Sequence, residues 1–149
     1  MTRKRRIPYK DLSPIAATPL FLAYLAGIID GEAWIGTRVV RNAGCPVRYT
    51  PTLRIAQAHE AGRAFLSDIR EFIGGLGYVH RGVSDCYELV LDGVNAARVL
   101  KAVLPYIVIK EKQAKLAIAL QEFRSRYRDP RVEECAHDAL KALNARKVA

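Results

Sequence analysis

Residues 25–33 have the sequence LAGIIDGEA and lie at the end of a helix predicted over residues 19–30. Ala23, Gly27 and Gly31 are spaced four apart, so they form a strip of small residues along one helix face. Glycine inside a helix costs about 0.8–1 kcal/mol relative to alanine, so a close helix–helix contact is expected to offset it. Another helix of the same chain is one candidate, but no other predicted helix has a matching strip. A two-fold axis presents the same strip twice, so the pattern favours a symmetric dimer.

Two carboxylates, Asp30 and Glu32, follow at the C-terminal end of this helix. That end carries the negative half of the helix dipole, which disfavours an acidic group by roughly 0.3–1 kcal/mol. The neighbouring residues Ile28, Ile29 and Ala33 are apolar. Acids in such a place indicate a cap, a salt bridge or a bound cation. Mg²⁺ suits the last case, because it takes one or two protein carboxylates and fills its shell with water and phosphate.

The rest of the chain predicts a regular alternation of elements. Thr18 and Pro19 form a helix start, with a capping side chain followed by proline at the first helical position. Further strands are expected over residues 34–41, 46–57, 78–82 and 86–91, and further helices over 60–73, 94–104, 110–127 and 130–145. This order is typical of an α+β domain with a four-stranded antiparallel sheet and helices on one face. We expect a single domain over residues 1–149, with a basic arm over 1–17 and a helical extension over 129–149.

The charge balance is strongly basic, with 24 Lys and Arg against 15 Asp and Glu, a formal net charge of +9 and a pI near 9.7. Such a chain favours polyanionic partners, either nucleic acid or an acidic membrane surface. The longest apolar run, residues 19–29, is too short to cross a bilayer, and no helix pairs a basic face with a large apolar one. We therefore expect no membrane association.

The three cysteines, Cys45, Cys86 and Cys135, are far apart and show no zinc-ligand spacing with the scattered histidines. Reduced thiols indicate the cytoplasm of a prokaryotic cell or an organellar matrix rather than secretion.

LAGIIDGEA resembles the LAGLIDADG signature of homing endonucleases, in the single-motif subclass that acts as a homodimer. Other segments are similar to family segments in the same order: IAQ at residues 55–57 with FL at 65–66, GLGYV at 75–79, and LPYIVIKEKQA at 104–114. The resemblance covers most of residues 19–120. It implies an α-β-β-α-β-β-α core whose sheet forms a DNA-binding saddle. It also implies an intron-encoded endonuclease that breaks both strands of a long pseudo-palindromic DNA site.

The resemblance assigns roles residue by residue. Glu32 matches the metal-binding acid, and Gly31 is the second predicted metal-site residue. Gly31 also matches the position where the two helices touch most closely. Lys110 matches the basic residue near the scissile phosphate, and Gln57 a polar residue that orders water. Arg63 is a candidate second basic group, although its spacing from Gln57 is shifted by about one residue. The implied cofactor is Mg²⁺, about two or three ions per dimer, with Mn²⁺ as a substitute.

The same signature departs from the family pattern at Ala33, where glycine is usual, and at Trp34, where small polar residues are common. We expect these changes to alter packing at the helix exit and to leave metal binding intact. The dimer interface implied by the signature comprises Leu22, Ala23, Ala26, Gly27, Asp30 and Gly31.

Recognition of DNA is expected from the sheet, because alternation places Arg48, Thr50, Thr52 and Arg54 on one face of their strand. Arginine pairs with guanine edges, and β-ribbons fit the major groove, although about half of such residues are expected to contact phosphate instead. A strand of roughly ten residues covers about 33 Å, so two subunits imply a site of about 20 base pairs. The predicted DNA-binding residues are Trp34, Gly36, Arg38, Arg41, Arg48, Thr50, Thr52, Arg54, His80, Arg81, Glu88 and Lys112.

Two alternatives stay open from the sequence. One is a maturase that binds intron RNA and no longer cuts, and the other is a DNA-binding regulator with the same fold and no catalytic activity. The presence of both Glu32 and Lys110 favours the nuclease.

Overall fold

The structure is a computed structural model of the chain, and it describes residues 3–4 and 11–145. The order of its main elements follows the predicted order of helices and strands. They are β1 (Arg3–Lys4), α1 (Pro19–Glu32), β2 (Ala33–Val40), β3 (Arg48–Ala58), α2 (His59–Phe72), β4 (Tyr78–Arg81), β5 (Cys86–Asp92), α3 (Val94–Val103), a short 3-10 helix (Leu104–Tyr106), α4 (Glu111–Arg126), β6 (Tyr127–Arg128) and α5 (Pro130–Ala145).

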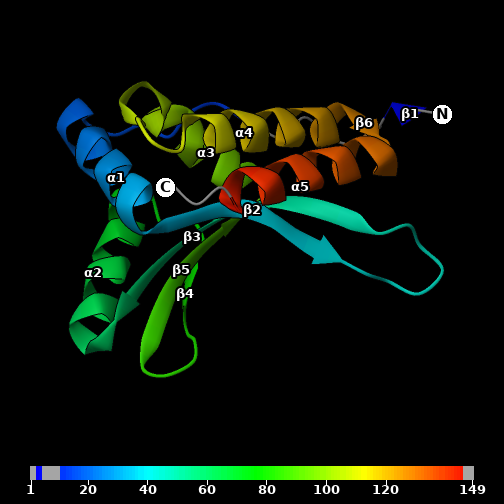
Figure 1. Cartoon of the computed structure of the whole chain (residues 1–149). Coiled ribbons are helices and arrows are strands. Elements are labelled where there is room, and N and C mark those ends of the chain that lie inside the picture. The colour runs from blue at the N-terminus through cyan, green and yellow to red at the C-terminus, as the bar shows by residue number, and fades with distance from the viewer. Residues whose placement is uncertain (1–2, 5–10, 146–149) are drawn as a thin grey trace.

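The central sheet has the strand order β2-β3-β5-β4, and every neighbouring pair is antiparallel. Figure 1 shows the helices gathered on one side of this sheet, while the strands curve away from them and leave the other face open. The predicted α+β class and the four-stranded antiparallel sheet are therefore confirmed.

Helix α1 begins as predicted, because the Thr18 side chain accepts a hydrogen bond from the Phe21 N–H and Pro19 occupies the first turn. It ends later than predicted, at Glu32, so Gly31 is helical and does not terminate it. The chain then passes directly into β2, and the Ala33 N–H still bonds to the Ile29 carbonyl. Glu32 is thus the last helical residue and stands where helix meets sheet.

The hydrophobic core lies between the helices and the inner face of the sheet. Leu25 and Ile29 of α1 pack there with Leu53 of β3, Leu89 of β5 and Leu100 of α3, all almost fully buried. Each such side chain contributes roughly 1.5–3 kcal/mol by leaving water. This packing fixes one face of α1 against the sheet and orients its end.

Helix α5 packs along β2, β3 and α4 through polar contacts as well as apolar ones. Glu133 is fully buried and accepts hydrogen bonds from Arg48 Nε (2.7 and 3.1 Å) and from Arg124 Nε (2.8 Å). Near its other end, the Asn144 amide donates to the Ile35 carbonyl of β2 at 2.8 Å. The helix therefore covers the outer edge of the β2–β3 hairpin.

A two-stranded pairing of β1 with β6 adds to the predicted elements, with Arg3 opposite Arg128 and Lys4 opposite Tyr127. Of the predicted basic arm, residues 1–2 and 5–10 lie outside the described part. Among the helices that the structure describes, none has the length and apolarity needed to cross a bilayer.

Candidate functional site

The C-terminal end of α1 carries Glu32 in an exposed position beside Lys110. Lys110 stands just before α4 and turns its ammonium group back to the junction of α1 and β2, where it donates to the carbonyls of Ile29 (3.0 Å) and Ala33. A cation at this end of a helix is stabilised by the helix dipole. The structure thus brings together the two residues that the family resemblance assigned to metal binding and phosphate contact.

Asp30 holds the segment that carries Lys110. Its carboxylate accepts hydrogen bonds from the backbone N–H groups of Val108 (2.9 Å), Ile109 (3.1 Å) and Lys110 (3.0 Å). Of the two acids proposed as cation ligands from the sequence, Asp30 is therefore occupied by backbone donors. Glu32 is the exposed one, and no residue in the described part of the chain bonds to its carboxylate.

The electrostatic state of Lys110 reflects two opposing influences. Partial burial lowers the pKa of Lys110 below its ordinary value, because the charged form loses hydration, while the carboxylates of Asp30 and Glu32 act in the opposite direction. The Lys110 ammonium group also donates to the carbonyl of Ala33, the residue next to Glu32, so the two residues belong to one site.

Gln57 lies at the end of β3, two residues beyond Ile55, which pairs with Ala33 directly after Glu32. This register brings Gln57 towards the end of α1. Its Cβ packs closely on Gly62 of α2, where an added Cβ would lie only 2.7 Å from it.

Arg63 is exposed and forms an ion pair with Glu60 on its own helix, which raises the pKa of Arg63. Its described contacts include neither Glu32 nor Lys110. The catalytic role of Arg63 stays a prediction, and so does that of Gln57.

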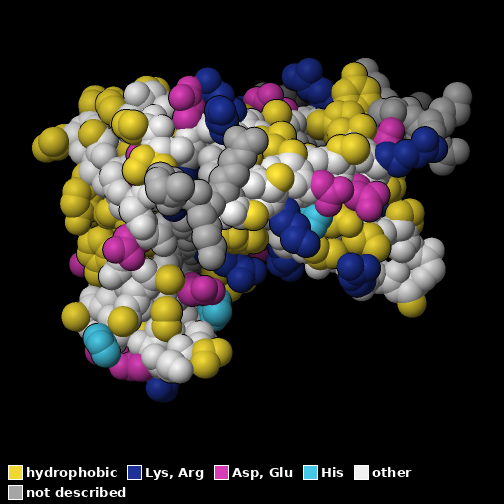
Figure 2. Space-filling model, in the orientation of Figure 1, with side chains coloured by type: hydrophobic (Ala, Val, Ile, Leu, Met, Phe, Trp, Pro, Cys, Tyr) yellow, Lys and Arg dark blue, Asp and Glu magenta, His cyan; other side chains and the backbone are white. Residues whose placement is uncertain are grey.

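The open face of the sheet carries most of the predicted DNA-binding residues. The strand register places Trp34, Gly36 and Arg38 of β2 on the same face as the even-numbered residues of β3, and His80 and Glu88 share that face. Figure 2 shows Lys and Arg side chains around the hollow beneath the sheet. Predicted residues that the structure leaves exposed or partly exposed are Trp34, Arg38, Arg41, Arg54, His80, Arg81, Glu88 and Lys112.

Four of the predicted DNA-binding residues are turned inward or covered, and the prediction needs correction there. Arg48 lies in the part of β3 that extends past the end of β5, and its side chain forms an ion pair with the buried Glu133. Thr52 is fully buried, and its hydroxyl donates to Asp92 at 2.7 Å. Thr50 is also buried, and the ring of Trp34 lies over Gly36. On a curved sheet, long side chains close over short ones, which alternation alone does not reveal.

Asp92 was not anticipated from the sequence. Besides holding Thr52, it forms an ion pair with Arg38 at 3.4 Å on the open face. The available signal was its alternation with Glu88 and Val90 in the same strand, which places all three on one face.

Of the six predicted interface residues, Ala23, Gly27 and Gly31 are exposed and Asp30 is partly exposed. Nothing lies within 4 Å of a Cβ added at Gly27 or Gly31, and Ala23 is exposed. Leu22 and Ala26, by contrast, are buried in the chain's own core, so they are removed from the predicted interface. The strip is extended by Leu20 and Tyr24, and Figure 2 shows hydrophobic side chains over this side of the molecule.

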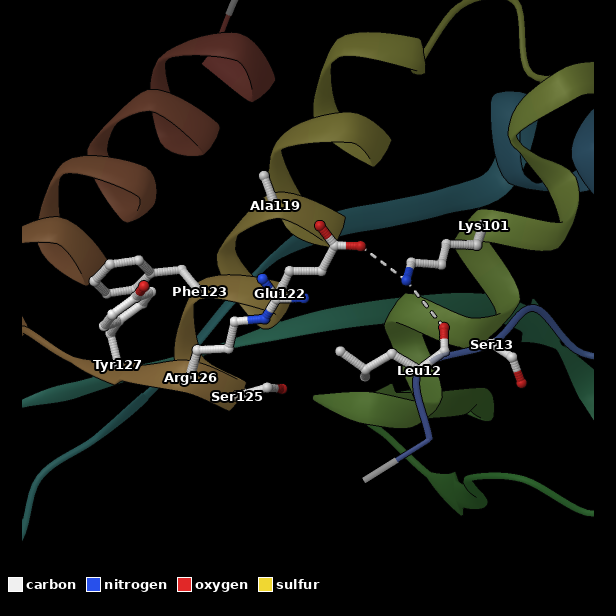
Figure 3. Close-up of a pocket in the computed structure, with 9 residues that line it drawn as sticks. All are labelled: Leu12, Ser13, Lys101, Ala119, Glu122, Phe123, Ser125, Arg126 and Tyr127. Atoms are coloured by element: carbon white, nitrogen blue, oxygen red, sulfur yellow. Dashed lines mark hydrogen bonds and ion pairs between the residues drawn. The ribbon is translucent and has the colours of Figure 1, made fainter. Parts of the chain in front are cut away.

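Among the cavities, one of about 500 Å³ lies between the N-terminal segment, α3, α4 and β6 (Figure 3). Lys101 crosses it and donates to the Leu12 carbonyl (3.0 Å) and to Glu122 (2.8 Å). Its lining includes no predicted site residue. Over residues 3–4 and 11–145, no three His, Cys, Asp or Glu side chains gather as metal ligands, so one chain presents a single available carboxylate at the end of α1.

The chain was compared with protein-family models, with known proteins and with solved structures. No protein-family model matches the chain. The DNA endonuclease I-CvuI of Chlorella vulgaris is 28% identical over 115 residues, which cover 76% of this chain and 71% of that protein.

The similar solved structures are also homing endonucleases. The homing endonuclease I-CvuI in complex with DNA matches with a TM-score of 0.73 and 25% identity over 87% of this chain and 85% of that one, and its complexes are described with Mg and with Ca. The archaeal intron-encoded homing endonuclease I-Vdi141I, complexed with DNA, shares the fold with a TM-score of 0.70 at 14% identity, over 87% of each chain. The likeness to LAGLIDADG homing endonucleases predicted from the sequence is confirmed.

Proposed function

We propose that this chain, which has the LAGLIDADG homing-endonuclease fold and a DNA endonuclease as its 28%-identical relative, is a site-specific DNA endonuclease that requires a divalent metal. The observation that carries the proposal is the position of Lys110, which bonds to the carbonyls of Ile29 and Ala33 on either side of the exposed Glu32, beside an open, basic sheet face. Glu32 supplies an exposed carboxylate and Lys110 a fixed positive charge. A carboxylate can hold a metal ion and a fixed positive charge can stabilise the phosphate, and both promote hydrolysis of a phosphodiester.

The open face of the sheet binds the DNA. Arg38, Arg54 and His80 stand on it, and the chain's net charge of +9 supports attraction to the phosphate backbone. Strand β3 has 11 residues, which correspond to roughly 36 Å or about ten base pairs of duplex. Two copies of the chain therefore cover about 20 base pairs.

The second copy docks on α1. The exposed strip of Ala23, Gly27 and Gly31 permits close approach of an identical helix about a two-fold axis, and the exposed Leu20 and Tyr24 flank it. Such a dimer brings two Glu32 side chains together near the axis. Each copy then acts on one DNA strand.

Glu32 and the Gly31 carbonyl are the proposed ligands of Mg²⁺, a hard cation that takes few protein oxygens and keeps water and phosphate in its shell. The bound metal supplies charge neutralisation and an activated water. Lys110 holds its ammonium group towards the same site and stabilises negative charge that develops on the phosphate. Gln57 orders water there.

Replacing the strip glycine tests the dimer. We expect Gly27→Leu to raise the dimer dissociation constant about tenfold to a hundredfold, because the added side chain keeps the helices apart. Within one chain the position is open and leucine favours helix more than glycine does, so the fold is kept. Sedimentation velocity over a concentration series measures the change. Ala119→Leu, at an exposed position on α4, is the control; equal self-association of both variants would contradict the proposed interface.

The lysine predicts a second outcome. Lys110→Met is expected to slow cleavage by about a hundredfold to a thousandfold, because the developing charge loses its fixed partner. Single-turnover cleavage with saturating enzyme measures it, and thermal melting of the variant shows the separate cost of the lost bonds to α1. Lys115→Met, in the same helix and exposed, is expected to cut at the wild-type rate. Unchanged cutting by Lys110→Met would remove this residue from the mechanism.

The function itself is tested with a deeply sequenced library of DNA duplexes, incubated with the protein and Mg²⁺, Ca²⁺ or a chelator. Double-strand cuts at one enriched, pseudo-palindromic motif, present with Mg²⁺ and lost with the chelator, support the proposal and identify the site. Selective binding without cutting in any metal would contradict the catalytic claim and favour a regulator.

A further inference from the structure

Trp34 forms a flat shelf on the DNA-facing side of β2. Its ring lies along the strand and covers Gly36, where an added Cβ would be 2.8 Å from Cε2 and closer still to two outer ring carbons. A residue with any side chain at position 36 would therefore displace the ring. Trp34 nevertheless stays 41% exposed, so the shelf faces outward.

Arg54 lies over this shelf from the neighbouring strand. The two residues are partners in the β2–β3 register, and Arg54 Cζ is 5.5 Å from the Trp34 ring centroid, within the range of a cation–π contact. Arg54 Nε is buried, and none of the described residues accepts a hydrogen bond from it. Burial closes Nε off from an outside acceptor, so the terminal amino groups of this partly exposed side chain are the donors that a bound molecule can reach.

Arg38 provides the contrast on the same face. Its Nε is paired with Asp92 at 3.4 Å, and its side chain is half exposed. A protein carboxylate therefore already engages this arginine, whereas Arg54 is held by an aromatic face that occupies none of its N–H groups. The two arginines differ in what they leave free for a ligand.

We infer that Trp34 is a positioning residue, whose ring holds the Arg54 guanidinium in the plane that reads a guanine in the DNA beside the cleavage site. Guanine presents two acceptors, O6 and N7, in the major groove, and a planar guanidinium contacts both. Trp34 follows Glu32 by two residues, so the base that is read lies next to the cleaved phosphates. This inference rests on the proposed endonuclease function and adds a specificity determinant to it.

The test is a base-preference profile, measured as relative binding in Ca²⁺ and relative cleavage in Mg²⁺ across all single-base variants of the selected site. Arg54→Ala is expected to lose about tenfold or more of the guanine preference at one position in each half-site. Trp34→Ala is expected to lose most of that preference at the same position and little elsewhere. Trp34→Phe, which keeps a ring, is expected to retain the preference.

Gly36→Ala supplies an independent variant, because it displaces the ring without deleting it, and it should reproduce the Trp34→Ala profile. Arg38→Ala is the matched control and should leave that guanine position unchanged. Thermal melting identifies any variant that has lost its fold, and the preference is then judged on the others.

Two outcomes would overturn the inference while the endonuclease stands. One is a Trp34→Ala base-preference profile identical to that of the wild-type protein. The other is an equal loss of affinity of Arg54→Ala for every sequence, which marks Arg54 as a phosphate contact. Absence of selective binding and cutting by the wild-type protein would instead overturn the proposed function, and this inference with it.

Discussion

Glu32→Gln is expected to cut the DNA site at least about a thousandfold more slowly than the wild-type protein and to bind it equally well. Glutamine keeps the shape of the side chain but removes the charge that holds Mg²⁺, and metal-based charge stabilisation supplies several kcal/mol to such reactions. Binding is preserved because the residue stands at the end of α1 and contributes no positive charge to the DNA face. Removal of its negative charge favours the polyanion slightly.

Two measurements separate these effects: fluorescence anisotropy with labelled duplex for binding, and single-turnover cleavage for chemistry. Glu111→Gln makes the same chemical change at an exposed carboxylate of α4 that pairs with Lys115, and it should cut normally. Rapid cutting by Glu32→Gln would assign the metal to other residues and leave the proposed mechanism without its main ligand.

Glu133→Ala is expected to cost about 3–5 kcal/mol of folding stability, the largest stability effect that the structure predicts. The carboxylate is fully buried and serves both Arg48 and Arg124, so its removal takes away the negative charge that these two largely covered guanidinium groups share. For a domain of this size the melting temperature should fall by roughly 10 °C or more.

Thermal unfolding followed by circular dichroism measures that fall. Glu134→Ala is the control, because the neighbouring acid is exposed on the same helical turn and should change the melting temperature little. Equal melting temperatures for the two variants would show that α5 does not depend on this network.

Much of the fold was predictable because local signals agree with the packing. Thr18 and Pro19 start α1, alternation marks the long hairpin, and glycines follow α2. The boundaries shifted where tertiary contacts override local preference: Gly31 stays helical because β2 begins directly after Glu32. The β1–β6 pairing was missed because strands of two residues have no periodicity to detect.

Part of the candidate site was likewise predictable from the sequence, and part was not. Glu32 and Lys110 were found by resemblance, but the hydrogen bonds from the loop backbone to Asp30 join segments distant in sequence and left no pattern. Arg48 and Arg54 alternate identically, yet only Arg48 borders the unpaired edge of β3 and can turn away to Glu133.

The predicted interface residues also show what a sequence motif leaves out, which is the direction in which each helical residue faces. Ala26 was grouped with Gly27 by the motif, but successive helical residues differ by about 100° in direction, so one faces the core and the other solvent.

The position of α5 along β2 also bears on how the protein stays in solution. Strand β2 is an eight-residue edge strand, and the unpaired backbone groups of an edge strand invite pairing with strands of other molecules. Here the helix lies against that strand, and Asn144 occupies the Ile35 carbonyl. The opposite edge, β4, has only four residues and offers a short template. A protein that keeps one whole sheet face open for a long duplex is thereby protected from fibre-like aggregation at both edges of the sheet.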